Sequence, residues 1–496
     1  MNAQRLDQLL HGIADAGTHG DIAVTGLNLD SRRVREGDAF FALCGTREHG
    51  IEFAAGAVAR GARVVLAEAP AREHAVTGTP VLWIEDLHAQ VGEIAARFYG
   101  RPSSALRVIG VTGTNGKTST VQLLAQALAS LGHRAASIGT LGAGLHGQLH
   151  EGERTTPDAI SVQGLLAGFR DAGASHVAME VSSHALDQGR VAGVGFEVAA
   201  FTNLTRDHLD YHGSMEAYGA AKAKLFAWPG LQAAAINVDD AFGRKLAAQL
   251  PGGVRVLRLS AAGDAAADVV ADRVATSAEG IAFELRTPWG SRTIHSPLLG
   301  RFNVANLLAV AACLGALGEP FERIADALES LQPINGRMNR LGGRDGLPLA
   351  VIDYAHTPDA LEQALTALRA HCDGRLICVF GCGGERDAGK RPQMGAIAER
   401  LADVAIVTDD NPRGEDGDAI VAQVVAGMAR PQAVRVERDR AVAIRAALHM
   451  AHRGDVVLIA GKGHETYQDG ATGKHPFDDL AVARDALEHF DMERHA

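Results

Sequence analysis

Residues 106–118 form the stretch LRVIGVTGTNGKT, in which an apolar run passes directly into a glycine-rich turn. The next residues, TSTVQLLAQALASLG at 118–132, have the apolar spacing of a helix. A buried strand, a glycine-rich turn and a helix in this order are the setting of a phosphate-binding loop in a parallel sheet. The sequence therefore predicts an α/β fold with a nucleotide site at the end of a central strand.

The side chains of this loop suit a nucleotide. Glycines let backbone N–H groups converge on phosphate oxygens, and Lys117 is expected to contact the terminal phosphates. The Thr118 hydroxyl is expected to bind Mg²⁺. The spacing departs from GxxxxGK[ST], because Val111 stands where the first glycine is usual, and a purely structural turn is the alternative. The predicted ATP-binding residues of the loop are Gly113, Thr114, Asn115, Gly116, Lys117 and Thr118.

Length and composition limit the class of protein. A chain of 496 residues exceeds one typical core, and a formal net charge of -11 argues against a nucleic-acid partner. No apolar run reaches the roughly 20 residues of a membrane span, and the first residues are charged, so we expect a cytoplasmic protein. Five cysteines without a CxxC pair favour reduced thiols over a zinc site.

Breaks in composition predict three domains, at residues 1–102, 103–333 and 334–496. The first boundary follows the Gly, Pro and Ser residues of 100–104, and the second lies near the turn at 333–337. Strand-like runs alternate with helical stretches in all three segments, as in a mostly parallel sheet covered on both faces. The last segment has four such runs: LAVIDYA, RLICVFGC, VAIVTDD and DVVLIAG.

The loop string GVTGTNGKTS resembles the ATP loop of the Mur ligase family, and further strings extend the resemblance over essentially the whole chain. They resemble the diaminopimelate-adding members in particular. The resemblance implies an N-terminal UDP-substrate domain, a central P-loop ATPase domain and a C-terminal Rossmann-like domain. The strings are DSRRVREGDAFFAL, TTPD, EVSSHALDQGRV, FTNLTRDHLDYHG, AAKAKLF, RFNVANLLA, GRMNRL, DYAHTPDAL, FGCGGERDAGKRP, DDNPRGED and GKGHETYQ.

The resemblance also implies a reaction. ATP would phosphorylate the D-glutamyl carboxylate of UDP-MurNAc-L-alanyl-D-glutamate, and the amine of meso-diaminopimelate would attack the acyl phosphate, releasing ADP and phosphate. Phosphorylation makes a poor electrophile reactive, and the meeting of two polyanions calls for a divalent metal and cationic side chains. The family further implies a monomer.

Five residues form the predicted catalytic and metal set. Besides Lys117, the resemblance points to Glu180 and His208 as Mg²⁺ ligands together with Thr118, and to Lys222 as a lysine carbamylated by CO₂. A carbamate is an anion, whereas an ammonium would repel a second metal ion. Taken alone, Glu180 could be a helix cap, His208 a surface residue and Lys222 part of a solvated helix face. Lys224 is expected to point away from Lys222.

Further nucleotide contacts are implied outside the loop. Asn303 and Asn306 offer amides suited to adenine or phosphate, and Arg337 and Asp353 resemble family residues that reach the nucleotide. His356 is a weaker candidate, with a strand-end cap as its alternative.

The resemblance places the UDP-linked substrate against two sets of residues. Leu29, Ser31 and the loop Thr46-Arg47-Glu48 are implied near the uridine. Hydroxyls and a guanidinium suit pyrophosphate and peptide oxygens. The residues implied there are Thr155, Thr156, Ser182, Gln188 and Arg190.

The stretch DNPR at 410–413 is implied to select the amino acid. Diaminopimelate differs from lysine by a distal carboxylate, which the Arg413 guanidinium can bind through two hydrogen bonds. Lysine-adding relatives lack this arginine, although DNPR by itself is also an ordinary turn. Glu465 is expected to accept a hydrogen bond from the distal ammonium. The full implied pocket is Arg386, Asp410, Asn411, Pro412, Arg413, Gly461 and Glu465.

Two other hypotheses stay open at this point. The nearest is a ligase of the same fold that adds lysine, or glutamate to a folate. The other is a nucleotide-dependent regulatory protein that makes no bond, which would be expected to lack the metal and acceptor residues.

Overall fold

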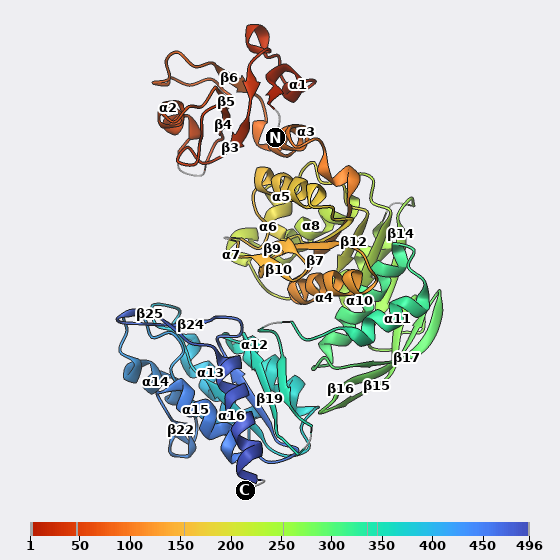
Figure 1. The fold of residues 1–496 in the computed structure, drawn as a ribbon, viewed down its shortest axis with the longest axis vertical. Helices are drawn as coiled ribbons and strands as arrows, with labels where there is room; N and C mark the ends of the chain where they lie inside the picture. Colours follow the sequence, from red (N-terminus) through yellow and green to blue (C-terminus); the bar gives the residue numbers. More distant parts are fainter. Residues whose placement is uncertain are drawn as a thin grey trace. The chain divides into compact units, whose positions relative to one another are not determined.

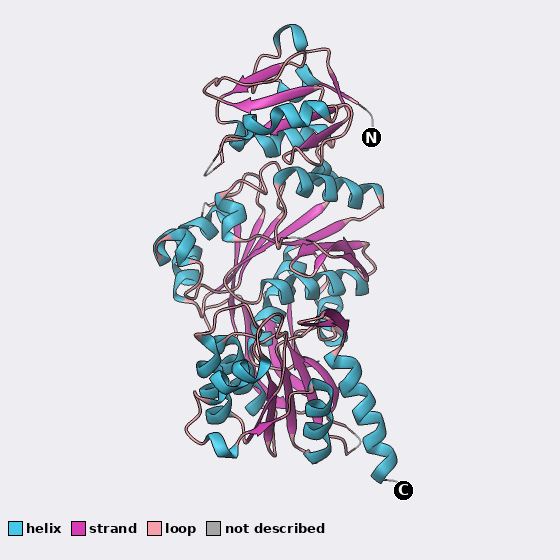
Figure 2. Cartoon of the chain, turned by 90° about the vertical axis from the view of Figure 1, so that its left-hand side faces the viewer, coloured by secondary structure: helices cyan, strands magenta, loops and turns pink. Residues whose placement is uncertain are grey.

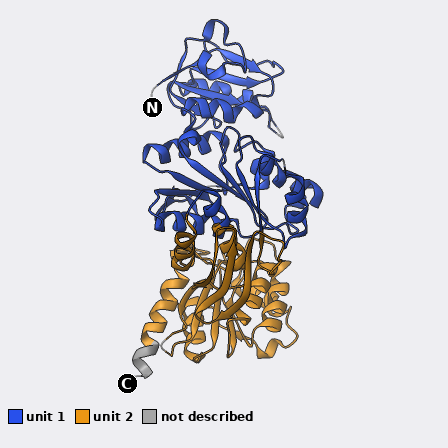
Figure 3. Ribbon diagram, turned by 90° about the vertical axis from the view of Figure 1, so that its right-hand side faces the viewer, with its two compact units in different colours: residues 1–258, 312–319 blue, residues 259–311, 320–496 orange. Residues whose placement is uncertain are grey.

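The structure is a computed structural model, and it describes residues 3–45, 48–152, 154–250, 252–334, 336–344 and 346–494. The chain forms two compact units (Figure 3). Unit 1 comprises Met1–Arg258 with Ala312–Glu319, and unit 2 comprises Leu259–Ala311 with Pro320–Ala496. Neither predicted domain boundary coincides with a limit between these units, so the residue limits of the three domains stay a prediction.

Unit 1 begins with a small parallel sheet. Its order is β3-β4-β5-β6, formed by Gly26–Asn28, Asp38–Ala42, Val64–Glu68 and Val81–Ile84. A short pair, β1 (Gln4–Arg5) and β2 (Ala23–Val24), and the helices α1 (Leu6–Leu10), α2 (Ala54–Ala59) and α3 (Leu87–Phe98) accompany it. Alternate residues of β4 enter opposite cores, with Phe41 in one cluster and Phe40 in the other.

The larger sheet of unit 1 contains β7, the strand that leads into the phosphate loop and α4 (Figure 1). Within the unit its strand order is β10-β9-β8-β11-β7-β12-β13, and the first residues of β14 follow. Strands β8, β11, β7, β12 and β13 are parallel neighbours, and β9 and β10 extend the edge in antiparallel fashion. The strands are β7 (Arg107–Thr112), β8 (Ala135–Gly139), β9 (Gly142–Leu145), β10 (Gln148–His150), β11 (His176–Glu180), β12 (Val198–Phe201), β13 (Ala233–Asn237) and β14 (Arg255–Ser260).

Helices connect these parallel strands and cover the sheet (Figure 2). Helix α4 packs against β8 and β11, next to the central strand β7. The helices are α4 (Lys117–Ser130), α5 (Ala159–Asp171), α6 (Ser183–Asp187), α7 (Leu209–His212), α8 (Met215–Ala223) and α9 (Ala241–Gln249). The predicted mostly parallel α/β arrangement is confirmed.

Unit 2 contains an antiparallel meander and a second, mostly parallel sheet. The meander is β15 (Val269–Ser277), β16 (Gly280–Thr287) and β17 (Gly290–Ser296), and α11 (Phe321–Ser330) packs on β17. The sheet order is β18-β19-β23-β20-β21-β22. Its strands are Asn339–Gly342, Leu349–Asp353, Val456–Ala460, Leu376–Phe380, Val404–Val407 and Arg435–Val436. Helix α10 (Phe302–Ala316) starts within this unit.

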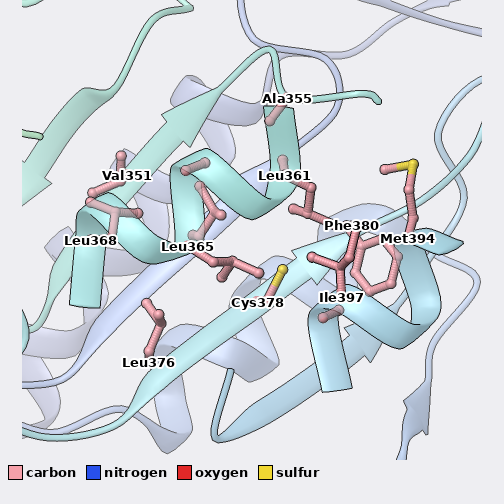
Figure 4. Packing of buried hydrophobic residues seen from close by; sticks show 14 of the residues in the cluster. Val351, Ala355, Leu361, Leu365, Leu368, Leu376, Cys378, Phe380, Met394 and Ile397 are labelled. Carbon is pink, nitrogen blue, oxygen red and sulfur yellow. The ribbon is translucent and has the colours of Figure 1, made fainter. Parts of the chain in front are cut away.

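Both faces of the second sheet are buried. Cys378 and Phe380 face the cluster under α12 (Pro358–Arg369), α13 (Lys390–Leu401) and α14 (Gly417–Val425), part of which Figure 4 shows. Ile377 and Val379 face the cluster under α15 (Arg440–Met450) and α16 (Asp479–Arg494). A hairpin, β24 (Tyr467–Gly470) and β25 (Gly473–Pro476), follows β23. Of the helices in the described ranges, none has the length and apolar character needed to span a bilayer.

Candidate active site

The phosphate loop, residues 113–116, joins β7 to α4 in unit 1. Gly113 has a φ of 148°, and a Cβ on it would lie 1.9 Å from Thr202 Oγ1, so a side chain does not fit there. Gly110 lies inside β7, where a Cβ would meet the Phe196 ring at 2.9 Å. Gly110 is therefore needed for packing inside β7, and the phosphate loop itself starts at Gly113. This later start accounts for the loop's departure from the usual glycine spacing.

The residues after β12 hold the loop in place. Thr202 Oγ1 donates to Asn115 O at 2.6 Å, and Asn115 N donates to Asn203 Oδ1 at 2.9 Å. Lys117 Nζ donates to Gly113 O at 2.9 Å and to Thr114 O at 2.8 Å. The loop is thus pre-organised by protein contacts. Thr202 and Asn203 were not among the predicted site residues, although they lie in the quoted string FTNLTRDHLDYHG.

Glu180 ends β11 beside the loop and is 1% exposed. Its carboxylate accepts from Thr118 Oγ1 at 3.1 Å and from Thr140 N at 2.7 Å. A buried carboxylate and a hydroxyl are hard oxygen ligands next to a phosphate loop, which fits the predicted Mg²⁺. Glu180 is not a helix cap, because Ser182 caps α6.

Lys222 lies on α8, is 1% exposed and donates from Nζ to Gly113 O at 2.8 Å. Its Nζ also lies 4.3 Å from the centroid of the Tyr218 ring. Burial, with a further contribution from the Lys117 charge, lowers the pKa of Lys222 to about 6. Lys224 is about half exposed and pairs with Asp187, so the predicted divergence of the two lysines is confirmed.

His208 precedes α7 with a φ of 51°, and its ring lies edge-on to His184 with centroids 4.8 Å apart. Tyr211 and His212 complete this aromatic group, with ring centroids 4.3 and 5.4 Å from that of His184. Among the residues that the structure describes, no group of three or more His, Cys, Asp or Glu side chains could hold a metal ion. Mg²⁺ often takes only one or two protein ligands together with phosphates and water.

The predicted peptide-side residues form one hydrogen-bonded network. Thr156 Oγ1 donates to Glu180 O at 2.8 Å, and Ser182 N donates to Thr156 Oγ1 at 3.2 Å. Arg190 donates from Nη1 to Thr156 O at 3.2 Å and from Nε to Gln188 Oε1 at 2.9 Å. Burial lowers the pKa of the Arg190 guanidinium. Thr155 Oγ1 lies 3.1 Å from Thr140 Oγ1, so this residue also lies near the Glu180 carboxylate.

A cleft of about 1540 Å³ in unit 1 brings Leu29, Ser31 and Glu48 together. Gly139 lines the same cleft, and a Cβ on it would lie 2.3 Å from Glu180 Oε1. The cleft therefore adjoins the carboxylate beside the phosphate loop. Thr46 and Arg47 lie outside the described residues.

The other predicted nucleotide contacts are in unit 2 and form two groups. Asn306 Nδ2 donates to Asn303 Oδ1 at 2.8 Å, and Asn303 Nδ2 donates to Leu299 O at 2.7 Å; both side chains are buried. These contacts occupy donors of the two amides near the start of α10. They link the two predicted asparagines directly.

The second group surrounds the Tyr354 ring. The Arg337 guanidinium lies 5.5 Å from its centroid, and the His356 ring centroid lies 4.5 Å from it. Arg337 Nε is buried and has no hydrogen-bond partner within the described ranges. Asp353 accepts from Met338 N at 2.8 Å, and burial raises the pKa of its carboxyl. Asp353 thus fixes the segment that follows Arg337.

The predicted amino-acid pocket lies where β21 and β23 end. Asn411 Nδ2 donates to Glu465 Oε2 at 2.9 Å, which brings the two predicted loops together. Lys462 is 0% exposed, and its Nζ donates to Asn411 Oδ1 at 2.9 Å and Glu465 Oε2 at 3.2 Å. Asp410 Oδ1 lies 3.8 Å from the same ammonium and has no hydrogen-bond partner among the residues that the structure describes. Lys462 was missed, although it stands in the string GKGHETYQ.

The two predicted arginines approach the pocket from a neighbouring loop. Arg413 has a φ of 52°, donates from Nη1 to Gly384 O at 2.7 Å and lies 3.5 Å from Asp469 Oδ2. A Cβ on Gly383 would lie 3.0 Å from Arg413 Nη1 and 3.7 Å from Arg386 Cγ, so the two arginines flank this glycine. Pro412 O packs against Gly384, and Gly461 faces the Asp410 carboxylate.

Three family models match consecutive parts of the chain. They are "Mur ligase family, catalytic domain" at residues 23–99, "Mur ligase middle domain" at 111–314 and "Mur ligase, glutamate ligase domain" at 336–463. Together with the phosphate loop and the mostly parallel sheets, these matches define an ATP-dependent ligase fold with N-terminal, central and C-terminal domains. The chain belongs to the Mur ligase family.

Relatives that match over nearly their whole length show which Mur ligases the chain resembles most. A Xanthomonas campestris pv. campestris protein is 59% identical over 485 residues, covering 98% of this chain and 97% of the relative. A Pseudomonas aeruginosa protein is 53% identical over 468 residues, covering 94% and 96%. Both are named UDP-N-acetylmuramoyl-L-alanyl-D-glutamate--2,6-diaminopimelate ligase.

Solved structures agree with this fold. One of a protein with the same name is 38% identical, has a TM-score of 0.78, and covers 99% of this chain and 100% of its own. The Thermotoga maritima MurF ligase in complex with ADP is 20% identical with a TM-score of 0.60, covering 95% and 99%. The latter likeness concerns the fold alone.

Proposed function

We propose that the chain joins meso-2,6-diaminopimelate to UDP-N-acetylmuramoyl-L-alanyl-D-glutamate at the cost of ATP, in peptidoglycan precursor synthesis. The observation that carries this proposal is the hydrogen bond between Asn411 and Glu465, which joins the 410–413 loop that carries Arg413 to the 461–465 loop. A guanidinium and a carboxylate there suit the distal carboxylate and ammonium of diaminopimelate. The names of the full-length relatives support the same substrate pair.

The first step is activation of the acceptor. The D-glutamyl carboxylate attacks the γ-phosphorus of ATP, the bond to the β-γ bridging oxygen breaks, and ADP leaves with an acyl phosphate formed. The backbone of residues 113–116 and Lys117 hold the phosphates. Bound Mg²⁺ would screen charge as the two anions meet, and Thr118, Glu180 and His208 would hold it. The partly buried hydrogen bond between Thr118 and Glu180 supports this assignment.

Lys222 supplies a second anionic ligand when it is carbamylated. Its pKa of about 6 leaves the amine largely neutral near pH 7, and a neutral amine adds to CO₂. The new N–C bond yields a carbamate anion and releases one proton. As an ammonium Lys222 does not fit a metal site, whereas as a carbamate it does. Its place at Gly113 O, beside the loop, supports this role.

The second step forms the amide bond. The amine nitrogen of diaminopimelate attacks the acyl carbon, the bond to the phosphate oxygen breaks, and phosphate leaves. The amine loses its proton to solvent in this scheme. Arg413 and Arg386 bind the distal carboxylate, and Glu465 binds the distal ammonium. These contacts orient the substrate and exclude lysine, which lacks the carboxylate.

ADP release tests the proposal against its rivals. Purified protein with Mg²⁺-ATP and UDP-MurNAc-L-Ala-D-Glu is given meso-diaminopimelate or L-lysine, and the peptide product is followed by mass spectrometry. Turnover with diaminopimelate alone is expected. Turnover with lysine would contradict the role of Arg413, and no turnover with either amine would favour the regulatory alternative. We propose that the enzyme acts as a cytoplasmic monomer. The family resemblance implies the monomer, and the soluble small-molecule substrates suit the cytoplasm.

A further inference from the structure

A fully buried ion pair lies at the carboxyl end of the C-terminal sheet. Arg440 begins α15 and Asp479 begins α16, and both side chains are 0% exposed. Arg440 Nε donates to Asp479 Oδ1 and Nη2 donates to Oδ2, each at 2.7 Å. Two parallel bonds of this kind fix the plane of the guanidinium.

The same guanidinium also holds two strand ends. Arg440 Nη2 donates to Ala460 O at 3.0 Å, and Nη1 donates to Asp409 O at 3.3 Å. Ala460 is the last residue of β23, directly before Gly461. Asp409 directly precedes the stretch 410–413. Each of the two carbonyls thus belongs to the residue directly before a predicted amino-acid-binding residue, Gly461 or Asp410.

The sheet itself does not join these two ends. Strand β20 lies between β21 and β23, so no ladder hydrogen bond links the strands that carry the two loops. Arg440 spans this gap with donors from one rigid, planar group. The separation of the 410–413 loop from the 461–465 loop is consequently set by a side chain as well as by the sheet.

We propose that Arg440, oriented by Asp479, is a positioning residue for the amino-acid substrate. It holds Asp409 O and Ala460 O so that Asn411 and Glu465 meet across the pocket. This inference rests on the proposed function of that pocket. It predicts that loosening the pair weakens binding of diaminopimelate most, because the phosphate loop and the UDP-substrate residues belong to unit 1. Asp353, the predicted nucleotide residue next to Ala460, is held by its own strand pairing with β23.

A second Arg-Asp pair at the opposite end of the same sheet provides a matched control. Arg375 donates to Asp455 Oδ2 from Nε at 3.1 Å and from Nη2 at 2.8 Å. This pair lies at the start of β20 and β23, which are already hydrogen-bonded neighbours. Weakening it should affect stability without moving the loops at the carboxyl ends.

The test compares Asp479→Asn with Asp455→Asn in the full-length protein. For Asp479→Asn we expect the KM for meso-diaminopimelate to rise about tenfold, with kcat and the KM values for ATP and UDP-MurNAc-L-Ala-D-Glu within about threefold. The preference for diaminopimelate over L-lysine should fall with it. Asp455→Asn should lower the thermal unfolding temperature and leave the KM for diaminopimelate unchanged.

A second variant covers a failure of Asp479→Asn to fold. Arg440→Met combined with Asp479→Leu removes both charges, and apolar replacement of a buried ion pair is often tolerated. This variant loses the donors to both carbonyls and should show the same selective rise in KM. An unchanged KM for diaminopimelate, or an equal rise in all three KM values, would overturn the inference. Absence of wild-type turnover would instead refute the proposed function.

Discussion

The phosphate-loop region of unit 1 and the amino-acid-binding loops of unit 2 each bury a lysine, and the two lysines have opposite surroundings. Lys222 in unit 1 is 1% exposed and its ammonium meets a backbone carbonyl, an aromatic ring and the charge of Lys117. Lys462 in unit 2 is 0% exposed and lies between Asn411, Glu465 and Asp410. Burial alone therefore does not tell what a lysine does.

The difference lies in the available counter-charge. Without a carboxylate in contact, burial favours the neutral amine of Lys222, which is the form that reacts with CO₂. With carboxylates in contact, Lys462 holds two loops together as part of an ionic network. Lys222 is suited to react with CO₂, whereas Lys462 is suited to hold two loops together. The following variants separate these two roles.

The largest effect is expected for Lys222→Arg. A guanidinium keeps a positive charge at pH 7 and cannot form the carbamate, so we expect kcat to fall about 10³-fold. ADP release at saturating substrates measures it. Lys224→Ala, two residues away and about half exposed, is the control and should stay within about twofold of wild type. Equal activity of Lys222→Arg and wild type would contradict the carbamate.

Methionine at each lysine should change stability in opposite directions. Lys462→Met leaves Glu465 and Asp410 without their buried counter-charge and should lower the free energy of unfolding by about 3 kcal/mol. Lys222→Met removes a desolvated amine without a carboxylate partner and should raise the unfolding temperature. Denaturant and thermal unfolding of both variants measure this. A similar loss of stability in both variants would show that the two lysines contribute equally to the free energy of unfolding, which would contradict this prediction.

Removal of the Arg413 guanidinium should act on substrate choice. Arg413→Ala is expected to lower kcat/KM for meso-diaminopimelate about 30-fold, since a charge-assisted pair of hydrogen bonds is lost. The value for L-lysine should change little. Steady-state kinetics with both amines measure the ratio. Parallel losses for the two amines would mean that Arg413 acts on the pocket as a whole.

The smallest effect is a pH dependence at Lys222. Because its pKa falls to about 6 in the folded chain, the rate of carbamylation at a fixed CO₂ concentration should drop about tenfold between pH 7 and pH 5, as the amine is protonated. The folded state also binds fewer protons than the unfolded state between about pH 6 and the ordinary lysine pKa near 10.5. Stability should consequently rise with pH across this window. Below pH 6 the folded state carries the full cost of burying the charged Lys222 ammonium.

Two measurements check this prediction. Incorporation of ¹³CO₂ by NMR reports carbamylation, and unfolding temperatures reported as wild type minus Lys222→Met isolate the proton linkage. A flat difference from pH 6 to 9 would contradict a neutral buried amine.

Much of the fold could be predicted because its signals are local. Apolar runs such as VAIVTDD and a glycine turn before a helix indicate strands and the phosphate loop within a few residues. The meander β15–β17 was not predicted, because whether these residues form strands depends on their pairing with neighbouring strands. Lys462 and Arg440 were missed for a related reason, since their partners Asn411 and Asp479 lie 51 and 39 residues away. The motif strings indicated which loops matter, and only the fold indicates which side chains hold them together.

The most direct test of the account uses D-glutamyl carboxylate labelled with ¹⁸O in the UDP-MurNAc dipeptide. Activation through an acyl phosphate predicts that one ¹⁸O appears in each released phosphate, together with one molecule of the diaminopimelate-containing product and one of ADP. Mass spectrometry of the phosphate and the product measures both. Phosphate without ¹⁸O, or label recovered in AMP, would contradict the proposed reaction.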